Sequence, residues 1–260
     1  MKNLLKQLYK QGKKAFDPAY QHAAKVESLG RKLYVIGGGK VFGGIFAAMK
    51  LPNISAVVKR PNIIVGSYES DIHPVLLDAI LWEPDKVVNI GSAEGYFAVG
   101  LAMLLNDKTP VYAFEQEERH WLDCAEMAAA NNIRESIIQK GFCSVNSLNE
   151  INAKRAFVLI DCEGGEMELL NPKEVPSLKS AFILCELHDF IVPNITAMLI
   201  ERFKETHHIN LVYENSKRIR DYRILNFLES VEERELALAE FRHVNNIPDQ
   251  GRWMVLKPKL

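Results

Sequence analysis

The sequence predicts an α/β fold with a doubly wound, mostly parallel sheet of seven strands and a helical N-terminal extension. From about residue 62 onward, short apolar runs rich in β-branched and aromatic residues alternate with helical patterns. This alternation is typical of parallel strands that helices cover on both faces. Hydrophobic residues make up 48% and charged residues 25% of the 260 positions, as in an ordinary globular protein with a packed core.

The predicted elements alternate along the chain. Each strand is a short apolar run bounded by turn residues, and each helix repeats apolar residues three or four positions apart. Strands are expected at residues 86–90, 110–115, 136–142, 156–161, 181–187, 209–215 and 252–258. Helices are expected at residues 74–82, 96–105, 118–132, 194–205 and 230–242. Right-handed crossovers join the parallel strands, and the direction of the last strand stays open.

Residues 1–60 are predicted to be a helical or irregular extension, and residues 61–260 to form the α/β domain. A helical pattern extends to about Val26. Its first part, Met1–Lys14, carries five lysines and no acid, with leucines at helical spacing, which predicts a basic amphipathic helix. Packing on the domain is favoured over peripheral contact with a membrane or nucleic acid. The glycine cluster Ile36–Gly44 lacks the Lys-Ser/Thr ending of a phosphate-binding loop, so a flexible turn is favoured.

Charge and cysteine usage narrow the class of protein. The net charge of −1 provides no global field that would recruit nucleic acid or an anionic membrane. The four cysteines form no CxxC pair, which suits a reducing compartment and argues against a zinc site. No signal peptide or membrane-spanning run is recognisable, so we expect a cytoplasmic protein.

The segment after the first predicted strand, "NIGSAEGYF", contains a glycine turn that opens a helix. Gly91 and Gly95 allow the backbone to approach a ligand, and the helix start offers free N–H groups. The spacing is not that of a dinucleotide-binding loop, because Ala93 replaces the second glycine. Glu94 would also repel a phosphate. An uncharged or cationic nucleoside therefore fits better than a dinucleotide.

The second predicted strand ends at Glu115, 24 positions after Gly91. An acid about 20 residues after such a turn grips the ribose hydroxyls in this class of fold. Ribose binding by Glu115 is favoured over a merely solvated carboxylate. Phe97 and Phe114 could line an adenine pocket, although core packing explains each of them at least as well.

In combination, "VVNIGSAEGYFAVGLA" and "VYAFEQEE" resemble the cofactor loop and the ribose-binding strand end of class I S-adenosylmethionine-dependent methyltransferases. "FVLIDCEGGEMELL" followed by "AFILCELHDF" resembles the FkbM-type members, and the resemblance covers about residues 62–215. It implies a Rossmann-like methyltransferase fold and S-adenosyl-L-methionine as cofactor. Asn89 departs from the pattern, because many relatives carry an acid there. The cofactor-binding residues that the resemblance implies are Glu69, Asn89, Gly91, Ser92, Ala93, Gly95, Phe97, Glu115 and Asp161.

The catalytic candidates are Asp161 at the end of the fourth strand and Glu186 and His188 at the end of the fifth. Neighbouring strands would bring the three side chains together beside the methyl group. His188 is the natural general base, because its unperturbed pKa lies near neutrality. The same three residues could hold a divalent cation. Because only three protein ligands are present, a base or substrate-binding role is favoured over a metal site. Glu163 and Glu166 are expected to serve the turn and the start of the next helix.

Two functions of different classes remain. The first is O-methylation of a hydroxyl on a small molecule or a sugar, which needs acceptor alignment and proton removal. The second is a catalytically idle module that keeps the cofactor-binding fold and serves a partner protein.

Cys162 is expected to be a small buried residue rather than a nucleophile, because no Pro-Cys motif follows the fourth strand.

Overall fold

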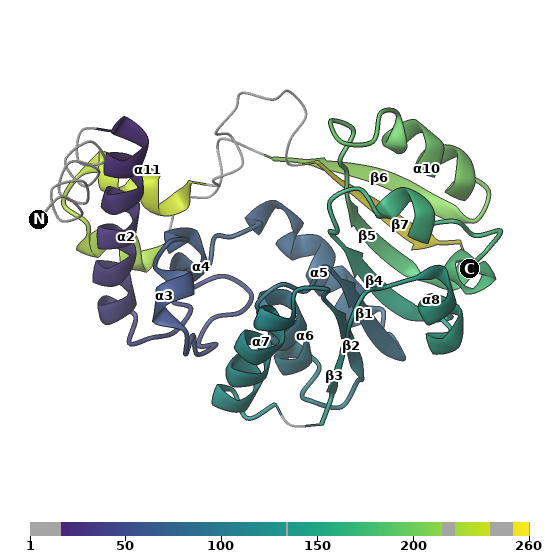
Figure 1. Ribbon diagram of the computed structural model, residues 1–260, viewed down its shortest axis with the longest axis horizontal. Coiled ribbons are helices and arrows are strands. Elements are labelled where there is room, and N and C mark those ends of the chain that lie inside the picture. Colours follow the sequence, from purple (N-terminus) through teal and green to yellow (C-terminus); the bar gives the residue numbers. More distant parts are fainter. Residues whose placement is uncertain (1–16, 134, 215–221, 240–251, 260) are drawn as a thin grey trace, which may run out of the picture. The chain divides into compact units, whose positions relative to one another are not determined.

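The computed structural model describes residues 17–133, 135–214, 222–239 and 252–259 (Figure 1). Contacts group these residues into two compact units. The larger unit contains residues 69–214 and 252–259, apart from residue 134, and the smaller unit contains residues 17–68 and 222–239. The expected basic helix at Met1–Lys14 lies outside the described residues. The division of the chain at residue 60 stays a prediction, as does the cytoplasmic location.

The larger unit is built on a seven-stranded sheet with the order β3-β2-β1-β4-β5-β7-β6. Its strands are β1 (Lys86–Ile90), β2 (Val111–Phe114), β3 (Ile137–Lys140), β4 (Ala156–Ile160), β5 (Phe182–Glu186), β6 (His207–Tyr213) and β7 (Arg252–Pro258). The predicted fold class, a doubly wound and mostly parallel sheet of seven strands, is confirmed.

The last strand enters the sheet antiparallel. The strands from β3 to β5 pair in parallel, whereas β7 runs antiparallel to both β5 and β6 between which it lies. In this register Glu186 pairs with Trp253 and Ile160 pairs with Cys185. The strand order reverses between β1 and β4, so ligands are expected beyond the carboxyl ends of these two strands.

Helices cover the sheet and end close to their predicted bounds. They are α5 (His73–Leu81), α6 (Tyr96–Leu104), α7 (Glu118–Ala130), α8 (Val145–Ile151), α9 (Glu166–Leu169) and α10 (Ile195–Phe203), with 3₁₀ turns η1 (Ser70–Ile72) and η2 (Pro176–Ser180). Helix α8 was not predicted from the sequence, and a capping box between Ser144 and Ser147 fixes its start.

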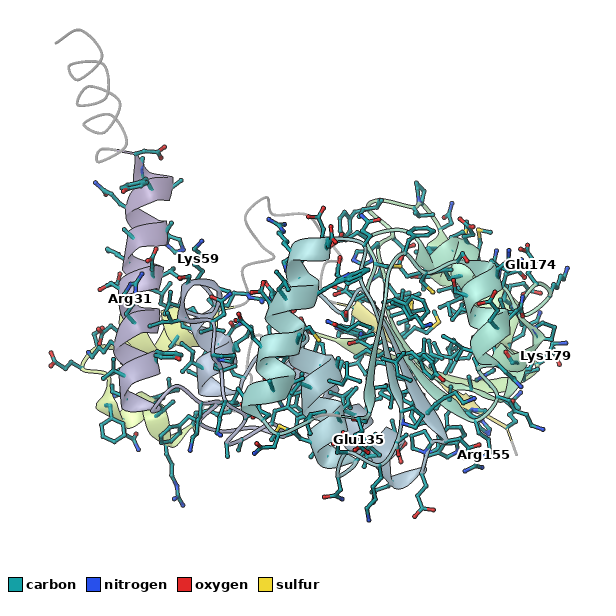
Figure 2. All side chains as sticks on the ribbon, turned by 60° about the horizontal axis from the view of Figure 1, so that its bottom comes forward. Arg31, Lys59, Glu135, Arg155, Glu174 and Lys179 are labelled. Carbon is teal, nitrogen blue, oxygen red and sulfur yellow. The ribbon has the colours of Figure 1, made fainter. Side chains whose placement is uncertain are left out.

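One face of the sheet carries the main apolar core. Val88, Val158 and Ile183 are buried there against Leu148 of α8, Leu169 of α9 and the α10 residues Leu199 and Phe203. In Figure 2 the sheet is lined by side chains on both faces, and charged residues such as Arg155, Glu174 and Lys179 lie on the outside. The central strands β4 and β5 are buried along their whole length, which explains why they appear as continuous apolar runs in the sequence.

The smaller unit contains α2 (Pro18–Ile36), α3 (Ile54–Val57), α4 (Pro61–Val65), η3 (Arg223–Phe227) and α11 (Val231–Leu238). The helix expected to end near Val26 continues to Ile36, so that "LYVI" is helical; Leu33 is buried, and α2 packs against α4. The glycine cluster then forms the turn that ends α2, with positive φ at Gly38 and Gly39. Among the described residues, no helix is long and apolar enough to cross a bilayer.

Candidate active site

The glycine turn after β1 is held against the neighbouring strands. The N–H groups of Gly91 and Ser92 both donate to the Phe114 carbonyl at 2.9 Å. Gly91 has a φ of +78°, and a Cβ atom there would lie 1.7 Å from the Asp161 carbonyl oxygen. Gly91 is therefore required by close packing on the end of β4, which is a different reason from the ligand approach that the sequence suggested.

Glu115 joins the end of β2 to this turn. Its Oε2 accepts a hydrogen bond from the Ala93 N–H at 2.9 Å, and its Oε1 accepts one from the Glu117 N–H at 2.8 Å. The two bonds fix the carboxylate in one orientation beside the turn. Each oxygen keeps a further lone pair for a ligand hydroxyl.

A cavity of about 330 Å³ lies beyond the carboxyl ends of β1, β2, β3 and β4. This volume lies within the range of small-molecule sites. Gly91, Ala93, Glu115 and Asp161, four of the predicted residues, line it. The remaining lining residues are Ile90, Phe114, Gln116, Gly141, Phe142, Cys143, Cys162, Glu163, Gly165, Glu168 and Leu169.

Sequence reasoning missed the cavity wall formed by Gly141, Phe142 and Cys143. These residues follow β3, and the Phe142 side chain is 70% exposed at the cavity. The rule that ligand-binding residues follow the strands would have found them, had it been applied to the third strand as well. Phe114, one of the two proposed adenine-lining aromatics, lines the cavity, whereas Phe97 instead packs edge-on against Tyr96.

The other predicted cofactor residues lie outside this cavity lining. Ser92 is buried, and Gly95 leaves room for Cys124, whose Sγ would lie 2.5 Å from a Cβ there. Asn89 is 2% exposed, and its Oδ1 has no hydrogen-bond partner among the described residues. A buried acceptor of this kind is uncommon in folded proteins.

Glu69 has a role that the sequence did not suggest. It is 4% exposed, and its Oε2 accepts a hydrogen bond from Nε1 of buried Trp253 on β7 at 3.0 Å. Glu69 and Ile72 are the N-cap residues of η1 and α5, and neither provides a side-chain cap. Glu69 thus helps to hold the strand that pairs with β5.

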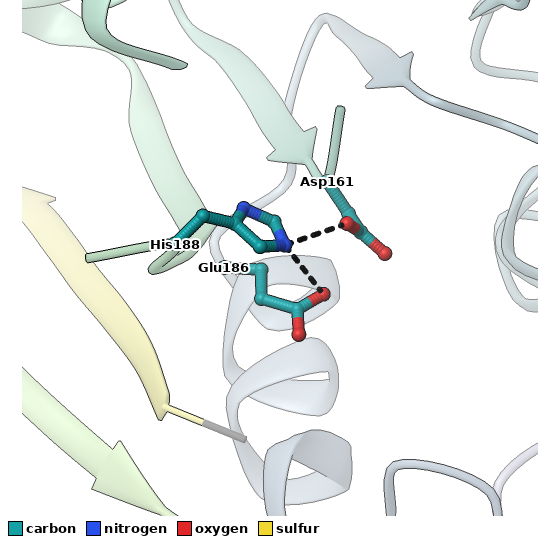
Figure 3. Close-up of side chains that lie close together, drawn as sticks. All are labelled: Asp161, Glu186 and His188. Carbon is teal, nitrogen blue, oxygen red and sulfur yellow. Dashed lines mark ion pairs between the residues drawn. The ribbon is translucent and has the colours of Figure 1, made fainter. Parts of the chain in front are cut away.

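Asp161, Glu186 and His188 meet at the ends of β4 and β5 (Figure 3). His188 Nε2 lies 3.7 Å from Asp161 Oδ1 and 4.0 Å from Glu186 Oε2. The exposed Glu163 places an Oε2 3.6 Å from the same nitrogen. One ligand atom from each of Asp161, Glu186 and His188 lies within 4.8 Å of the others, so the trio could also hold a divalent cation.

Glu166 is the closest partner of His188. Its Oε1 lies 2.9 Å from His188 Nδ1 and accepts the Cys162 N–H at 3.0 Å, while its Oε2 accepts the Gly164 N–H at 2.8 Å. The expected role in the turn is therefore present, and a contact with His188 is added to it. Nothing local in the sequence indicates a partner 22 positions away.

The charges around His188 decide its protonation. Burial lowers the pKa of His188, but the hydrogen bond to Glu166 and the charges of Glu166, Asp161 and Glu163 outweigh it, so that the pKa is raised. Burial raises the pKa of Glu166, and the hydrogen bonds from His188 and the Cys162 N–H more than reverse this, so that the pKa is lowered. Glu166 is therefore an ionised acceptor at neutral pH.

We expect the Cys162 thiol to be unreactive in the folded protein. Burial raises its pKa well above the usual range, and the charges of Glu166 and Asp161 add to the increase. Because the thiolate is the reactive form, alkylation by iodoacetamide at neutral pH should be at least ~100-fold slower than for free cysteine. Mass spectrometry of native and unfolded protein measures both rates, and alkylation of native Cys162 at the free rate would contradict this expectation.

Comparisons with known proteins give only structural similarity. An O-methyltransferase from Streptomyces achromogenes in complex with SAM aligns with a TM-score of 0.45 and 14% identity, over 72% of this chain and 78% of that chain. An rRNA methylase from Streptococcus thermophilus aligns with a TM-score of 0.47 and 12% identity, over 73% of this chain and 96% of that chain. An O-methyltransferase from Bacillus cereus in complex with SAH aligns with a TM-score of 0.47 and 12% identity, over 89% of this chain and 91% of that chain. No protein-family model and no curated protein matches the sequence.

Proposed function

We propose that this protein is an FkbM-like methyltransferase that transfers the methyl group of S-adenosyl-L-methionine to a hydroxyl of a small molecule or a sugar. One observation carries the proposal. Asp161 lines the cavity that contains Glu115, and it also lies 3.7 Å from Nε2 of His188. The side chain of Asp161 thus lies both at a cavity suited to a nucleoside and next to an imidazole suited to proton removal.

The residues at the cavity fit S-adenosyl-L-methionine. Glu115 offers a fixed carboxylate to two ribose hydroxyls, and Ile90, Phe114 and Leu169 offer apolar contacts to a base. The unpartnered Asn89 Oδ1 is an acceptor of the kind that an ammonium group can use. The carboxylates of Asp161 and Glu163 give this region a negative charge, which favours a cationic ligand.

When bound, S-adenosyl-L-methionine supplies an electrophilic methyl group on a sulfonium. The protein residues must align the acceptor oxygen and remove its proton as the new bond forms. His188 Nε2 is placed to accept that proton, since Nδ1 is already bonded to Glu166. Asp161 and Glu186 lie beside Nε2, where their charges stabilise the imidazolium that results.

Calorimetry with S-adenosyl-L-methionine and S-adenosyl-L-homocysteine tests the cofactor assignment. We expect both to bind, and Glu115→Gln to weaken binding by about tenfold or more, because a charged partner of the ribose hydroxyls is lost. Glu174→Gln, an exposed carboxylate outside the cavity, is the matched control. Absence of heat with both ligands would overturn the proposal. Binding without methyl transfer to a panel of sugars, phenols and aliphatic alcohols would favour the idle binding module.

We expect methyl transfer to survive removal of divalent cations. Magnesium prefers oxygen ligands, and a structural zinc site usually has four protein ligands, whereas the present trio offers two carboxylates and one imidazole. If His188 acts as the base, dialysis against EDTA should change kcat by less than about twofold. The radiolabelled methyl-transfer rate before and after dialysis measures this. A loss that added Mg²⁺, Mn²⁺ or Zn²⁺ restores would instead assign the trio to a metal.

A further inference from the structure

Glu166 is a buried carboxylate whose surroundings consist of hydrogen-bond donors. Its exposed fraction is 0%, and it is the first residue of the short helix α9. The backbone N–H groups of Cys162 and Gly164 both donate to it. A carboxylate that receives two backbone N–H bonds stays ionised, so it can only accept a hydrogen bond from a third partner.

That third partner is Nδ1 of His188, at 2.9 Å. A neutral imidazole carries its single proton on one nitrogen, and the nitrogen facing an ionised carboxylate must be the one that carries it. His188 is therefore held as the tautomer with a proton on Nδ1. Its Nε2 keeps a free lone pair in the neutral form, and this is the nitrogen that faces Asp161 and Glu186 (Figure 3).

The distances around Nε2 agree with this assignment. Asp161, Glu163 and Glu186 approach it at 3.6 to 4.0 Å, which is longer than a direct hydrogen bond. None of the three carboxylates therefore forms a direct hydrogen bond with the Nε2 lone pair. By contrast, the contact with Glu166 at Nδ1 is a direct hydrogen bond.

We propose that Glu166 is a positioning residue, which fixes the tautomer and orientation of His188 so that Nε2 is the nitrogen that takes the acceptor proton. This inference rests on the proposed methyltransferase function. In the proton transfer, the bond from the acceptor oxygen to hydrogen breaks and a bond from Nε2 to hydrogen forms. The freed electron pair of the oxygen would form the bond to the methyl carbon of bound S-adenosyl-L-methionine, while the methyl–sulfur bond breaks and its electron pair stays on the sulfur. Glu166 takes up no proton in this step.

The same carboxylate also holds the turn after β4, which lines the cofactor cavity through Cys162 and Glu163. A purely structural clamp on this turn is the competing explanation for Glu166. The two explanations differ in what they predict for the imidazole. A clamp has no effect on the tautomer of His188, whereas a positioning residue determines it.

Nitrogen-15 NMR of the imidazoles in the full chain measures the tautomer directly. The chain has seven histidines, and His188→Asn assigns the resonance of His188. In the wild type we expect a protonated Nδ1 and an unprotonated Nε2 at a pH where His188 is neutral. Glu166→Met should shift the population to a proton on Nε2, and Glu166→Gln, which keeps a polar group for the turn, should do so at least in part.

Glu201→Met is the matched control, because Glu201 is an exposed carboxylate of the larger unit that forms an ion pair with Lys204. It should leave the His188 resonances unchanged. A wild-type His188 with its proton on Nε2, or a tautomer unchanged in both Glu166 variants, would overturn the positioning role. This measurement needs no turnover and no bound cofactor, so its failure is separate from failure of the proposed function.

A double-mutant cycle links the tautomer to catalysis. Glu166→Gln should lower kcat by about 10²-fold or more in the wild-type background, in the range that a misplaced general base costs. In the His188→Asn background it should lower kcat no further, because the residue through which Glu166 acts is gone. An equal loss in both backgrounds would assign Glu166 to the clamp alone.

Discussion

Replacing His188 with asparagine or alanine should lower kcat for methyl transfer by about 10²–10⁴-fold, the usual contribution of a general base. Nε2 of His188 is the nitrogen beside Asp161 and Glu186, and neither replacement side chain offers a basic nitrogen there. The dissociation constant for S-adenosyl-L-methionine should change by less than about threefold, because His188 does not line the cofactor cavity. Single-turnover kinetics and calorimetry measure the two quantities separately.

The two replacements differ in their effect on stability. Alanine leaves the buried Glu166 carboxylate without its imidazole partner, which costs roughly 1–3 kcal/mol. The asparagine amide can still donate to Glu166 from near the position of Nδ1, so His188→Asn should be the more stable of the two. Normal turnover in both variants would rule out His188 as the base.

The pH profile of the wild type follows from the raised pKa of His188. The base acts only in its neutral form, and Glu166 and the nearby carboxylates favour the protonated form. Activity should therefore be lost as the pH falls through an inflection that lies above the ordinary histidine value of about 6.5. His188→Asn should lack this inflection.

Gly91→Ala should destabilise the protein by roughly 3 kcal/mol or more. The residue has a φ of +78°, which costs an L-residue roughly 1–2 kcal/mol. Its new methyl group would also lie 1.7 Å from the Asp161 carbonyl oxygen, so the end of β4 must move. Because Asp161 lies at that end, cofactor binding should weaken along with folding. Urea unfolding and calorimetry measure both effects.

Gly141→Ala provides the comparison within the same unit. Gly141 has no positive φ, and an added Cβ would meet Trp121 at an ordinary distance of 3.6 Å. Its free energy of unfolding should stay within about 0.5 kcal/mol of the wild type. Equal stability of Gly91→Ala and Gly141→Ala would show that the turn after β1 can relax without strain.

Much of the fold could be predicted from the sequence, because the central strands β4 and β5 are buried on both faces. The run Lys86–Ile90 and the run Arg252–Pro258 coincide with β1 and β7 as predicted. The direction of β7 could not be predicted, since an apolar run has the same pattern in a parallel and in an antiparallel strand. The end of α2 could not be predicted either, because "LYVI" suits a strand by composition, whereas in the structure it is helical and Leu33 is buried in the smaller unit.

The candidate site could be predicted from the sequence where the strand topology alone brings its residues together. Asp161, Glu186 and His188 lie at the carboxyl ends of two adjacent parallel strands, so their meeting could be predicted from strand order. Glu166 could be placed in its turn but not beside His188, because that contact depends on how the turn folds back in space. Glu69 was likewise assigned to the cofactor on position, whereas the bond to Trp253 depends on a strand 184 positions away.

The position of β7 has a consequence for synthesis of the chain. This strand is the last one described along the chain, yet it lies between β5 and β6. A nascent chain that ends before residue 252 therefore exposes the unpaired edges of both strands, one of which leads into Glu186 and His188. Exposed strand edges pair readily with other chains. Folding of this site during translation must wait for the last strand to leave the ribosome, and ribosome-bound intermediates are the stage at which aggregation is expected.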